Sequence, residues 1–566
     1  MKVWIVLAAV LLAACKSGGD DDFPASVGGA GGSGGSAGSG GSGGAGPNPP
    51  PPANAPRCAS GEAPLLMSGS AAMADAKTYR MLPFDVVPGT TRIEVGYRWT
   101  DVLPLPSTPI TQTVFDLGLW DNDGYRSPFG FRGWSGSRQG KIGSQPPVFV
   151  QSDSADRGYT PGAIEPGVWY VDLGIAAVGP SGANWEVQVA CLNPPTGPVP
   201  SADPVNASHV ARTGPAWYHA DTHMHGFHSN PNAPDDADFI EQARAAQLDV
   251  LFVTEYVTGR HWDELGALQR AHPDLLIWPG REIITYFGHA NTFGETRGVL
   301  EYRHGFEDVT LGEIQRLSNA EGALFQVNHP LTFPGPLFAN FCRGCAFELG
   351  GNIDWNAVDT VEVANGPILV DATDLGLPLP IPLQIQNPFT QPAIDLWQDL
   401  LMQGYKITAT SGSDSKGVDA PTDRARKGYG SSATAIYAQN LSRAAISAAL
   451  RAGHAYIRTR GVMHSPALEF RVETMDGQRG IFGDTVMADT ATLTTVVTGG
   501  QNQFLVYTQN GQLAGIAPIT SDPFTHTMTA GRASEAGPLG TFWRVDTFDL
   551  QSLTTIGNPV FLQAPP

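Results

Sequence analysis

Hydrophobic and polar positions alternate with two different periods along the chain, and the change of period divides it into regions. From residue 57 to 200 the period is two, as at 91–97 and 169–173, and glycine and proline separate the short runs. This pattern is typical of β-strands and predicts an N-terminal β-sandwich. Short alternating runs return from 461 to 566, where Asn510-Gly511 marks a hairpin, so a second and smaller β-sandwich is predicted there.

The region between residues 201 and 460 shows strand and helix patterns in turn. An amphipathic helix at 236–247 precedes an apolar strand at 248–253, and Thr310 with Glu313 forms a capping box that begins another helix. Helix–strand pairs are predicted at 310–319 with 323–327 and at 392–402 with 406–409, followed by a helix at 441–452. Repeated units of this kind predict a parallel sheet, and this many around one core predict a barrel.

The composition limits the function classes. The chain has 566 residues, of which 42% are hydrophobic, enough for several domains with cores of their own. Lys and Arg total 34 against 54 Asp and Glu, and the resulting net charge of −20 repels phosphate backbones. Binding to nucleic acid through charge is therefore not expected, and a highly charged polyanionic substrate is disfavoured.

The N-terminus predicts export. Residues 1–14 carry Lys2 and then an apolar run too short to span a bilayer, which is typical of a cleaved signal peptide. The run ends in Leu12-Ala13-Ala14-Cys15, which resembles the cleavage box of bacterial lipoproteins and implies a membrane-anchoring lipid on Cys15. An ordinary secretory signal is the alternative. The Gly-, Ser- and Pro-rich residues 15–56 predict a tether, and the expected location is the bacterial cell envelope, as an outer-membrane lipoprotein facing the periplasm or the outside.

Four further cysteines suit an exported protein, because that compartment permits disulfides. Cys58 and Cys191 bracket the N-terminal region and are predicted to pair. Cys342 and Cys345 either form a tight loop disulfide or supply half of a zinc site. The lack of a second such pair in the sequence favours the disulfide.

Side chains able to bind metal ions follow several predicted strands of the central region. They are His223, His225, Glu255, Glu282, His289, His329 and Asp414. The carboxyl ends of barrel strands converge on one face, so these residues are expected to meet although they span nearly 200 positions. His-x-His on a strand places both imidazoles on one side, and imidazole with carboxylate suits zinc, manganese or iron. The set predicts a metal site in preference to acid–base groups that work without metal.

The same region resembles a known family. The segments that carry the resemblance are Asp221-Thr222-His223-Met224-His225, residues 248–255, Pro279-Gly280-Arg281-Glu282, Gly288-His289-Ala290-Asn291, Asn328-His329-Pro330 and Gly412-Ser413-Asp414. In this order they resemble the PHP (polymerase and histidinol phosphatase) superfamily of metal-dependent hydrolases, over residues 217–456. Pro-Gly-x-Glu, Gly-His-x-Asn and the segment 361–366 resemble its CehA/McbA-like branch. The resemblance implies a distorted (β/α)7 barrel and hydrolysis of a phosphate, carboxylate or carbamate ester by metal-activated water.

The resemblance also implies a set of metal ligands. A first cation would be held by His223, His225, Glu282 and Asp414, and a second would share Glu282 and add His289 and His329. The third site of the superfamily departs here: Thr254-Glu255-Tyr256 stands in place of the usual Thr-Asp-His, and Asp414-Ser415-Lys416 in place of Asp-x-His. At most two divalent cations are therefore expected.

Three residues at these departures are candidates for catalytic roles, namely Lys416, Tyr256 and Glu255. The Lys416 ammonium would stabilise a substrate oxyanion without a metal, and Tyr256 would donate a hydrogen bond or act as an acid. In the alternative reading, Lys416 only forms an ion pair with Glu255 and fills space. Arg281 and Arg343 would either grip an anionic substrate or be solvated.

A non-enzymatic function is the rival hypothesis. An inactive PHP-like domain, held at the cell surface by lipid, would serve as a carbohydrate-binding or adhesion module. Trp120, Trp134 and Trp169 would then form a sugar-binding face, although in a sandwich they also fit the core. Retention of a bridging carboxylate at Glu282 favours the enzyme, and metal analysis separates the two hypotheses.

Overall fold

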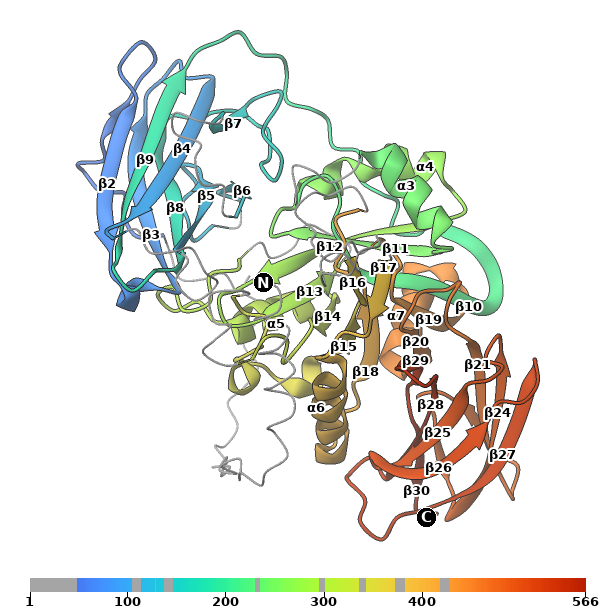
Figure 1. The fold of residues 1–566 in the computed structure, drawn as a ribbon. Coiled ribbons are helices and arrows are strands. Elements are labelled where there is room, and N and C mark those ends of the chain that lie inside the picture. The colour runs from blue at the N-terminus through green and yellow to red at the C-terminus, as the bar shows by residue number, and fades with distance from the viewer. Residues whose placement is uncertain are drawn as a thin grey trace, which may run out of the picture.

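The computed structural model describes residues 48–103, 113–127, 129–136, 146–229, 235–294, 301–334, 343–371, 382–417 and 428–565. Two β-rich regions lie at opposite ends of a central domain, with the N-terminal one in blue and the C-terminal one in red (Figure 1). The predicted signal segment, Cys15 and most of the tether lie outside the described residues, as does Cys342. Within the described part of the chain, no helix is both long and apolar enough to cross a bilayer.

The N-terminal region consists of two sheets that pack over a shared core. One sheet has the order β1 (Arg57–Cys58), β3 (Thr78–Val86), β8 (Gly167–Ala177), β5 (Val114–Trp120) and β6 (Phe131–Trp134). The other has the order β2 (Leu65–Ala71), β9 (Ala183–Leu192), β4 (Arg92–Asp101) and β7 (Val148–Gln151). Alternate residues of both sheets, such as Phe84 and Val187, are fully buried in this core. A two-sheet architecture follows, as the alternating pattern predicts.

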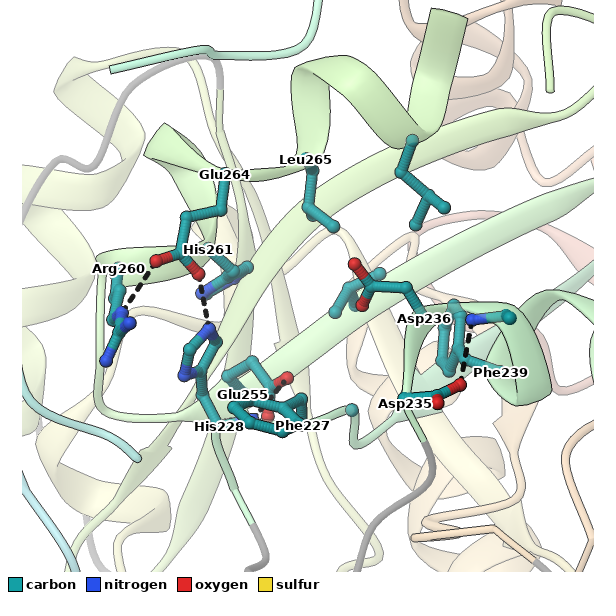
Figure 2. Close-up of a pocket in the computed structure, with 14 residues that line it drawn as sticks. Phe227, His228, Asp235, Asp236, Phe239, Glu255, Arg260, His261, Glu264 and Leu265 are labelled. Carbon is teal, nitrogen blue, oxygen red and sulfur yellow. Dashed lines mark hydrogen bonds and ion pairs between the residues drawn. The ribbon is translucent and has the colours of Figure 1, made fainter. Parts of the chain in front are cut away.

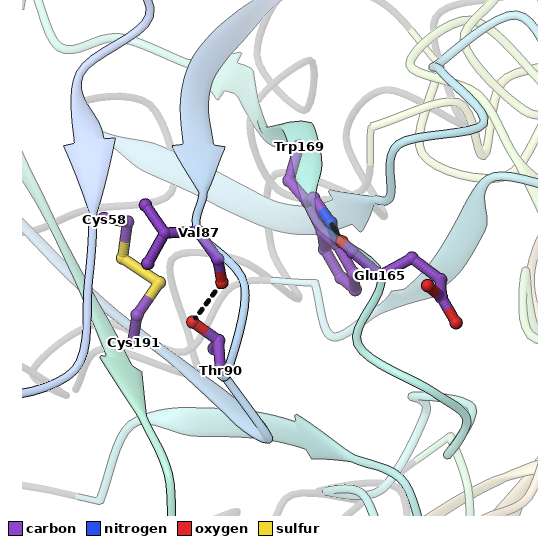
Figure 3. Close-up of a disulfide and its surroundings, with 6 residues drawn as sticks. All are labelled: Cys58, Val87, Thr90, Glu165, Trp169 and Cys191. Atoms are coloured by element: carbon purple, nitrogen blue, oxygen red, sulfur yellow. Dashed lines mark hydrogen bonds between the residues drawn. A yellow bond between two sulfur atoms is a disulfide. The ribbon is translucent and has the colours of Figure 1, made fainter.

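A disulfide ties the two sheets together. Cys58 on β1 and Cys191 on β9 are bonded, with their Cα atoms 5.6 Å apart, so the predicted pairing is confirmed (Figure 3). Trp169 lies near this end of the core and donates its indole N–H to the Glu165 carbonyl at 2.9 Å. Trp120, Trp134 and Trp169 are all buried, at 2%, 8% and 0% exposure. The sugar-binding face proposed for them is therefore wrong, and they belong to packed cores.

The central domain is built on a curled sheet with helices around it. Its strands are β10 (Val210–Met224), β11 (Val250–Tyr256), β12 (Leu276–Ile284), β13 (His289–Phe293), β14 (Leu324–Val327), β15 (Thr360–Asn365), β18 (Thr408–Gly412), β19 (Ala433–Ser442) and β20 (Ala455–Arg458). The described α-helices are α3 (Asp236–Ala245), α4 (Leu265–Ala271), α5 (Leu311–Ala320), α6 (Thr390–Gln403) and α7 (Arg443–Ala452). A two-stranded ribbon, β16 (Ile368–Asp371) and β17 (Pro382–Ile385), lies beside it. Short 3-10 turns occur at Met73–Asp75, Arg260–Asp263, Gly350–Asn352 and Trp355–Ala357.

The sheet contains two groups of three parallel strands. β10, β11 and β12 form one, β14, β15 and β18 form the other, and β13 joins them by running antiparallel to both neighbours. The strands from β10 to β18 curl until these two meet: Met224 at the end of β10 forms a parallel bridge with Ser415 just beyond β18. The carboxyl ends of both groups therefore face one another.

The strand directions do not confirm a seven-unit (β/α) barrel. Five α-helices are present among the described residues, and two strands, β13 and β19, run in the opposite direction to the other strands of the central sheet. Only residues 285–288 connect β12 to β13, and Thr285 closes that turn by accepting hydrogen bonds from the N–H groups of Phe287 and Gly288. A parallel crossover needs a dozen or more residues, so this short connection forces a hairpin.

The helix ends follow local chemistry that the sequence displays. Thr310 caps α5 by accepting a hydrogen bond from the Glu313 N–H at 3.1 Å, as the capping motif predicts. Gly404 and Gly453 end α6 and α7 in the left-handed conformation, with φ of 102° and 85°. The predicted helices are present with bounds shifted by up to two residues.

The C-terminal region also has two packed sheets, and one of them continues the central sheet. The separate sheet has the order β22 (Arg479–Ile481), β21 (Ala467–Thr474), β24 (Thr490–Thr498) and β27 (Phe524–Gly531). The continuous one contains β29 (Leu553–Gly557), β28 (Thr541–Phe548), β25 (Phe504–Gln509) and β26 (Gln512–Pro518), with β30 (Val560–Gln563) and β23 (Thr485–Met487) attached. β29 pairs with β20, so a single sheet of 15 strands spans both domains. The predicted Asn510-Gly511 hairpin connects β25 and β26.

One side chain of the C-terminal region reinforces the central sheet. The Asn558 amide donates to the carbonyls of Ala409 and Ala455 at 3.0 and 2.9 Å, and it accepts from the Ala409 N–H at 2.8 Å. Asn558 is buried at 1% exposure. Its side chain therefore links β18 and β20 through hydrogen bonds to the backbone of both strands.

The N-terminal region packs on the central domain through buried polar contacts. Tyr302 donates its hydroxyl to Asp172 at 2.7 Å, and Tyr286 donates to Asp116 at 2.9 Å. The ring of Tyr286 also stacks on Tyr79, with centroids 4.9 Å apart. The two aspartates lie on the N-terminal sheet and the donors belong to the central domain, so the two regions form one packed unit.

This interface predicts a pH dependence. Burial raises the pKa of Asp172 from an ordinary 3.8 to about 6, so the folded state holds a proton that the unfolded state releases. Stability should therefore fall as pH rises from about 4 to 6, by about 3 kcal/mol from this group. Asp172→Asn removes the titration, and urea unfolding between pH 4 and 8 should show the variant gaining on the wild type as pH rises. A difference that does not change with pH would contradict the prediction.

Candidate metal centre

The six residues predicted as metal ligands lie at the carboxyl ends of central strands or on the adjoining hairpin. His223 is on β10, Glu282 on β12 and His289 at the start of β13, while His225, His329 and Asp414 lie one or two residues beyond β10, β14 and β18. Two of them have unusual backbones: His329 has φ of 30° and Asp414 has φ of 51°. Positive φ is strained for residues with a Cβ, and such strain is concentrated at functional sites.

The Glu282 carboxylate lies at the middle of the cluster and is only 2% exposed. Its Oε1 is 3.2 Å from His289 Nδ1, 3.4 Å from His223 Nε2 and 3.6 Å from His329 Nε2. Its Oε2 is 3.5 Å from His225 Nε2. One carboxylate thus touches four imidazoles that approach it from three different strand ends.

Asp414 completes a first set of donors. Its Oδ1 lies 3.0 Å from His225 Nε2 and 3.6 Å from His223 Nε2. These three residues and Glu282 offer ligand atoms that all lie within 4.8 Å of one another. His289 and His329 face Glu282 as a second pair, with ring centroids 5.2 Å apart. The structure therefore brings all six predicted residues together.

A sulfur atom lies near the second pair. His289, His329 and Cys345 also have ligand atoms within 4.8 Å of one another. Cys345 is disulfide-bonded, so it offers no free thiolate to a cation. The predicted pairing with Cys342 involves a residue outside the described part of the chain.

The charges of the cluster offset one another. Burial alone lowers the pKa of His223, but Glu362, Asp414 and Glu282 outweigh it and hold that pKa well above its usual range. Burial likewise opposes ionisation of Glu282, yet His223, His289 and His329 keep its pKa well below the usual value. Burial together with the Lys416 charge lowers the pKa of His225 to about 4, which leaves that imidazole neutral. The centre therefore stabilises positive charge and contains a neutral imidazole.

The residues present fit divalent cations. His223 Nε2 and His329 Nδ1 are buried without a hydrogen-bond partner among the described residues, although buried polar atoms are normally paired. Ligands bound about 2.1 Å from a zinc ion at tetrahedral angles lie about 3.4 Å from each other. The carboxylate oxygens of Glu282 and Asp414 lie 3.0 to 3.6 Å from the imidazole nitrogens. Both the donor types and their spacing match a cation that is held by imidazole and carboxylate.

Sequence reasoning missed one buried carboxylate beside the ligands. Glu362 on β15 is 0% exposed, and its Oε2 accepts from His223 Nδ1 at 3.2 Å and from the His329 N–H at 3.0 Å. Its segment belongs to the family resemblance, but a single Glu within a strand carries no ligand spacing. Only the pairing of β15 with β14 and β18 reveals it.

Lys416 and Tyr256 lie at the edge of the centre. Lys416 Nζ is 3.6 Å from Asp414 Oδ1 and 5.2 Å from the centre of the Tyr256 ring. Burial opposes the charge of Lys416, but Tyr256 and Asp414 outweigh it and raise its pKa, so the ammonium form persists. Burial raises the pKa of Tyr256, so the phenol keeps its proton. The ion pair that Lys416 forms here is with Asp414, so the alternative pairing with Glu255 is wrong.

Glu255 lies on the opposite side of β11 from Tyr256. Its carboxylate accepts from the Ser229 hydroxyl and, at 3.2 Å, from the His228 N–H. It lines a cavity of about 370 Å³ that includes none of the six ligand residues. Figure 2 shows Glu255 there with His228, whose ring is 2.7 Å from Glu264, and Glu264 in turn binds Arg260. The structure does not bring Glu255 to the metal-facing side, where a catalytic group is needed.

Of the two arginines considered as anion ligands, Arg281 is buried against a tryptophan, and the charge of Arg343 acts on the buried Asp116, where burial raises the pKa and Arg343 opposes that rise. Arg281 is 4% exposed and its guanidinium lies 5.1 Å from the centre of the Trp262 ring. Arg343 contributes its backbone carbonyl, which accepts from His289 Nε2 at 2.8 Å. That hydrogen bond leaves His289 Nδ1 as the nitrogen that faces Glu282.

No protein-family model and no curated protein matches the chain. Among solved structures, it is similar to a two-domain protein containing a predicted PHP-like metal-dependent phosphoesterase from Bacteroides vulgatus ATCC 8482. The two share 14% identity and a TM-score of 0.30, over 63% of this chain and 99% of that one. It is also similar to a protein proposed to be a metal-dependent phosphoesterase from Bifidobacterium adolescentis ATCC 15703. That pair shares 13% identity and a TM-score of 0.23, over 37% of this chain and 90% of that one. At such TM-scores neither likeness supports a conclusion about this chain.

Proposed function

We propose that the protein is a metal-dependent hydrolase that holds two divalent cations, zinc, manganese or iron. One observation carries the proposal: the buried Glu282 carboxylate lies within 3.6 Å of four imidazole nitrogens that belong to two ligand groups. A carboxylate between two groups of imidazoles is the arrangement that bridges paired cations. Bound there, such cations supply Lewis acidity and a hydrolytic water that is active near neutral pH.

The chain's own residues complete the proposed site. The Lys416 ammonium, next to Asp414, is placed to bind a developing oxyanion on the substrate. The Tyr256 phenol, whose ring centroid is 4.2 Å from that of His225, is placed to donate a hydrogen bond to the same substrate. Both groups keep their protons near neutral pH, so each acts as a donor.

Finer features belong to the same proposal. The substrate would be a phosphate, carboxylate or carbamate ester, with phosphoesters favoured because the Lys416 charge suits an anionic oxygen. The sequence motifs support membership of the PHP superfamily and its CehA/McbA-like branch. The N-terminal segment supports a lipoprotein of the bacterial cell envelope, with the hydrolase held on the tether.

Metal analysis combined with an activity screen tests the proposal. Full-length protein is expected to contain about two ions per chain and to hydrolyse at least one of a phosphodiester, a phosphomonoester and an aryl carbamate when Mn²⁺, Zn²⁺ or Fe²⁺ is added. If the protein takes up no ions from solutions of Mn²⁺, Zn²⁺ or Fe²⁺, the proposal that it is a hydrolase is wrong, and a carbohydrate-binding or adhesion module is favoured instead.

Removing the charge of Lys416 tests its proposed role. Lys416→Met is expected to lower kcat about tenfold or more while metal content stays at the wild-type level. Lys406→Met is the matched control, because Lys406 lies outside the centre and over the ring of Phe561. Turnover is measured on the best substrate of the screen, and wild-type turnover in Lys416→Met would rule the role out.

A further inference from the structure

Both imidazoles of the His-x-His pair turn Nε2 toward Glu282. Nδ1 faces a different partner in each, the Glu362 carboxylate for His223 and the Ser229 hydroxyl for His225. We propose that Glu362 and Glu255 are positioning residues that fix His223 and His225 with the proton on Nδ1, so that Nε2 is free to bind a cation. Glu362 acts directly, and Glu255 acts through the hydroxyl of Ser229. The inference rests on the proposed function, because it concerns the same metal centre.

We call each path of contacts from a carboxylate to an imidazole an arm. The first arm, from Glu362 to His223, is a direct contact. Glu362 Oε2 lies 3.2 Å from His223 Nδ1, while His223 Nε2 faces Glu282 and Asp414 at 3.4 and 3.6 Å. A carboxylate oxygen accepts hydrogen bonds, so His223 Nδ1 is the donor in this contact, and a His223 that binds a cation would present the lone pair of Nε2. The same Oε2 accepts from the His329 N–H at 3.0 Å. Glu362 therefore holds one ligand of each proposed cation.

The second arm runs through Ser229. The Ser229 hydroxyl donates to Glu255 and accepts from the Tyr256 N–H at 2.8 Å. It also lies 3.1 Å from His225 Nδ1. A hydroxyl has one hydrogen to donate, and that of Ser229 is donated to the Glu255 carboxylate. In the contact between Ser229 and His225, Nδ1 must therefore be the donor. His225 Nε2 is then left for Asp414, Glu282 and a cation.

The two arms differ in reach. Glu362 holds His223 of the first ligand group and the backbone of His329 in the second group, whereas Glu255 reaches only His225 of the first group. Carboxylates that orient metal-binding imidazoles change metal affinity by about 10- to 100-fold when they are removed. Loss of Glu362 should therefore weaken both cations, and loss of the Ser229 arm should weaken only one.

Glu362 is assigned a positioning role although it also groups with His223 and His329 as a candidate ligand set. His223 has two ring nitrogens, and Nε2 already faces the Glu282 and Asp414 donors. A separate cation on Glu362 would need Nδ1, which is the nitrogen bonded to Glu362 itself. The geometry therefore favours a hydrogen bond over a third cation at this carboxylate.

The test is a titration of metal-free, full-length protein with MnCl2, which reports two binding steps without any substrate. Glu362→Gln is expected to weaken both steps about tenfold or more, and Ser229→Ala and Glu255→Gln to weaken one step only. Ser229→Thr keeps the hydroxyl and should retain wild-type affinity. Glu264→Gln is the matched control, since Glu264 lines the same cavity as Glu255 and binds His228.

A double variant decides whether Glu255 works through Ser229. Ser229→Ala with Glu255→Gln should bind Mn²⁺ no more weakly than Ser229→Ala alone, because the connection is already broken. A further loss in the double variant, or unchanged affinity in Glu362→Gln, would overturn the inference. Thermal unfolding of the metal-free variants separates lost affinity from lost fold. Wild-type protein that binds no Mn²⁺, Zn²⁺ or Fe²⁺ would instead refute the proposed function.

Discussion

Glu282→Gln is expected to abolish activity, with kcat reduced by about three orders of magnitude and metal content falling from two ions to one or none. The carboxylate lies within 3.6 Å of four imidazole nitrogens. Its negative charge balances the positive charge of the cluster, whether that charge comes from protonated imidazoles or from bound cations. Glutamine keeps the shape but replaces one oxygen by an NH2 group, which has no lone pair for a cation. The bridge is lost and two groups of imidazoles face an uncharged amide.

Mass-spectrometric metal analysis and steady-state kinetics measure the two effects separately. Glu313→Gln is the matched control, because Glu313 is half-buried on α5, away from the centre, and forms an ion pair only with Arg316 among the described residues. Both ions retained in Glu282→Gln, with kcat within tenfold of the wild type, would show that Glu282 does not bridge cations.

Gly412→Ala is expected to separate two strands that build the centre. A Cβ at Gly412 would lie 2.3 Å from the Cβ and 2.6 Å from the backbone nitrogen of His223, and a backbone atom cannot move aside as a side-chain tip can. β18 must then shift away from β10, at a cost of about 1–3 kcal/mol. Asp414 follows two residues later, so it should move away from the imidazoles with which it would bind a cation.

The expected readout is a lower unfolding midpoint together with loss of at least one metal ion. Gly531→Ala is the matched control, since a Cβ at Gly531 on β27 meets no atom within 4 Å. If Gly412→Ala kept its stability and both ions, close contact between the two strands would not be needed for the metal centre.

Local patterns in the sequence were sufficient for the elements and for much of the site. Alternation identified the paired sheets at both ends, and caps such as Thr310 and Gly404 marked the helix ends because they depend only on neighbouring residues. The ligands could be listed because strand ends in one sheet meet on one face, wherever they lie in the sequence. In the structure, four of the six ligand residues form one group that includes Glu282, and the other two, His289 and His329, lie beside Glu282.

The remaining features depend on long-range pairing that a local pattern does not contain. The direction of β13 follows from the short connection of four residues between β12 and β13, and no local pattern in the sequence gives that direction. Glu362 can be assigned to the site only when the pairing of β15 with β14 is known. Glu255 and Tyr256 face different sides of β11 because successive residues of a strand point in opposite directions. The join of β20 to β29 likewise depends on residues about 100 positions apart, between Tyr456 and Gly557.

The amide that holds β18 has a consequence for how the protein acquires its cations. Asn558 lies 149 positions after Ala409, so a chain that is still being synthesised has made Asp414 but not the residue whose amide holds β18. Asp414 is therefore expected to reach the imidazoles only after the last strands have folded. If the protein is the proposed hydrolase, its complete cation site would form late, when synthesis of the chain is nearly over.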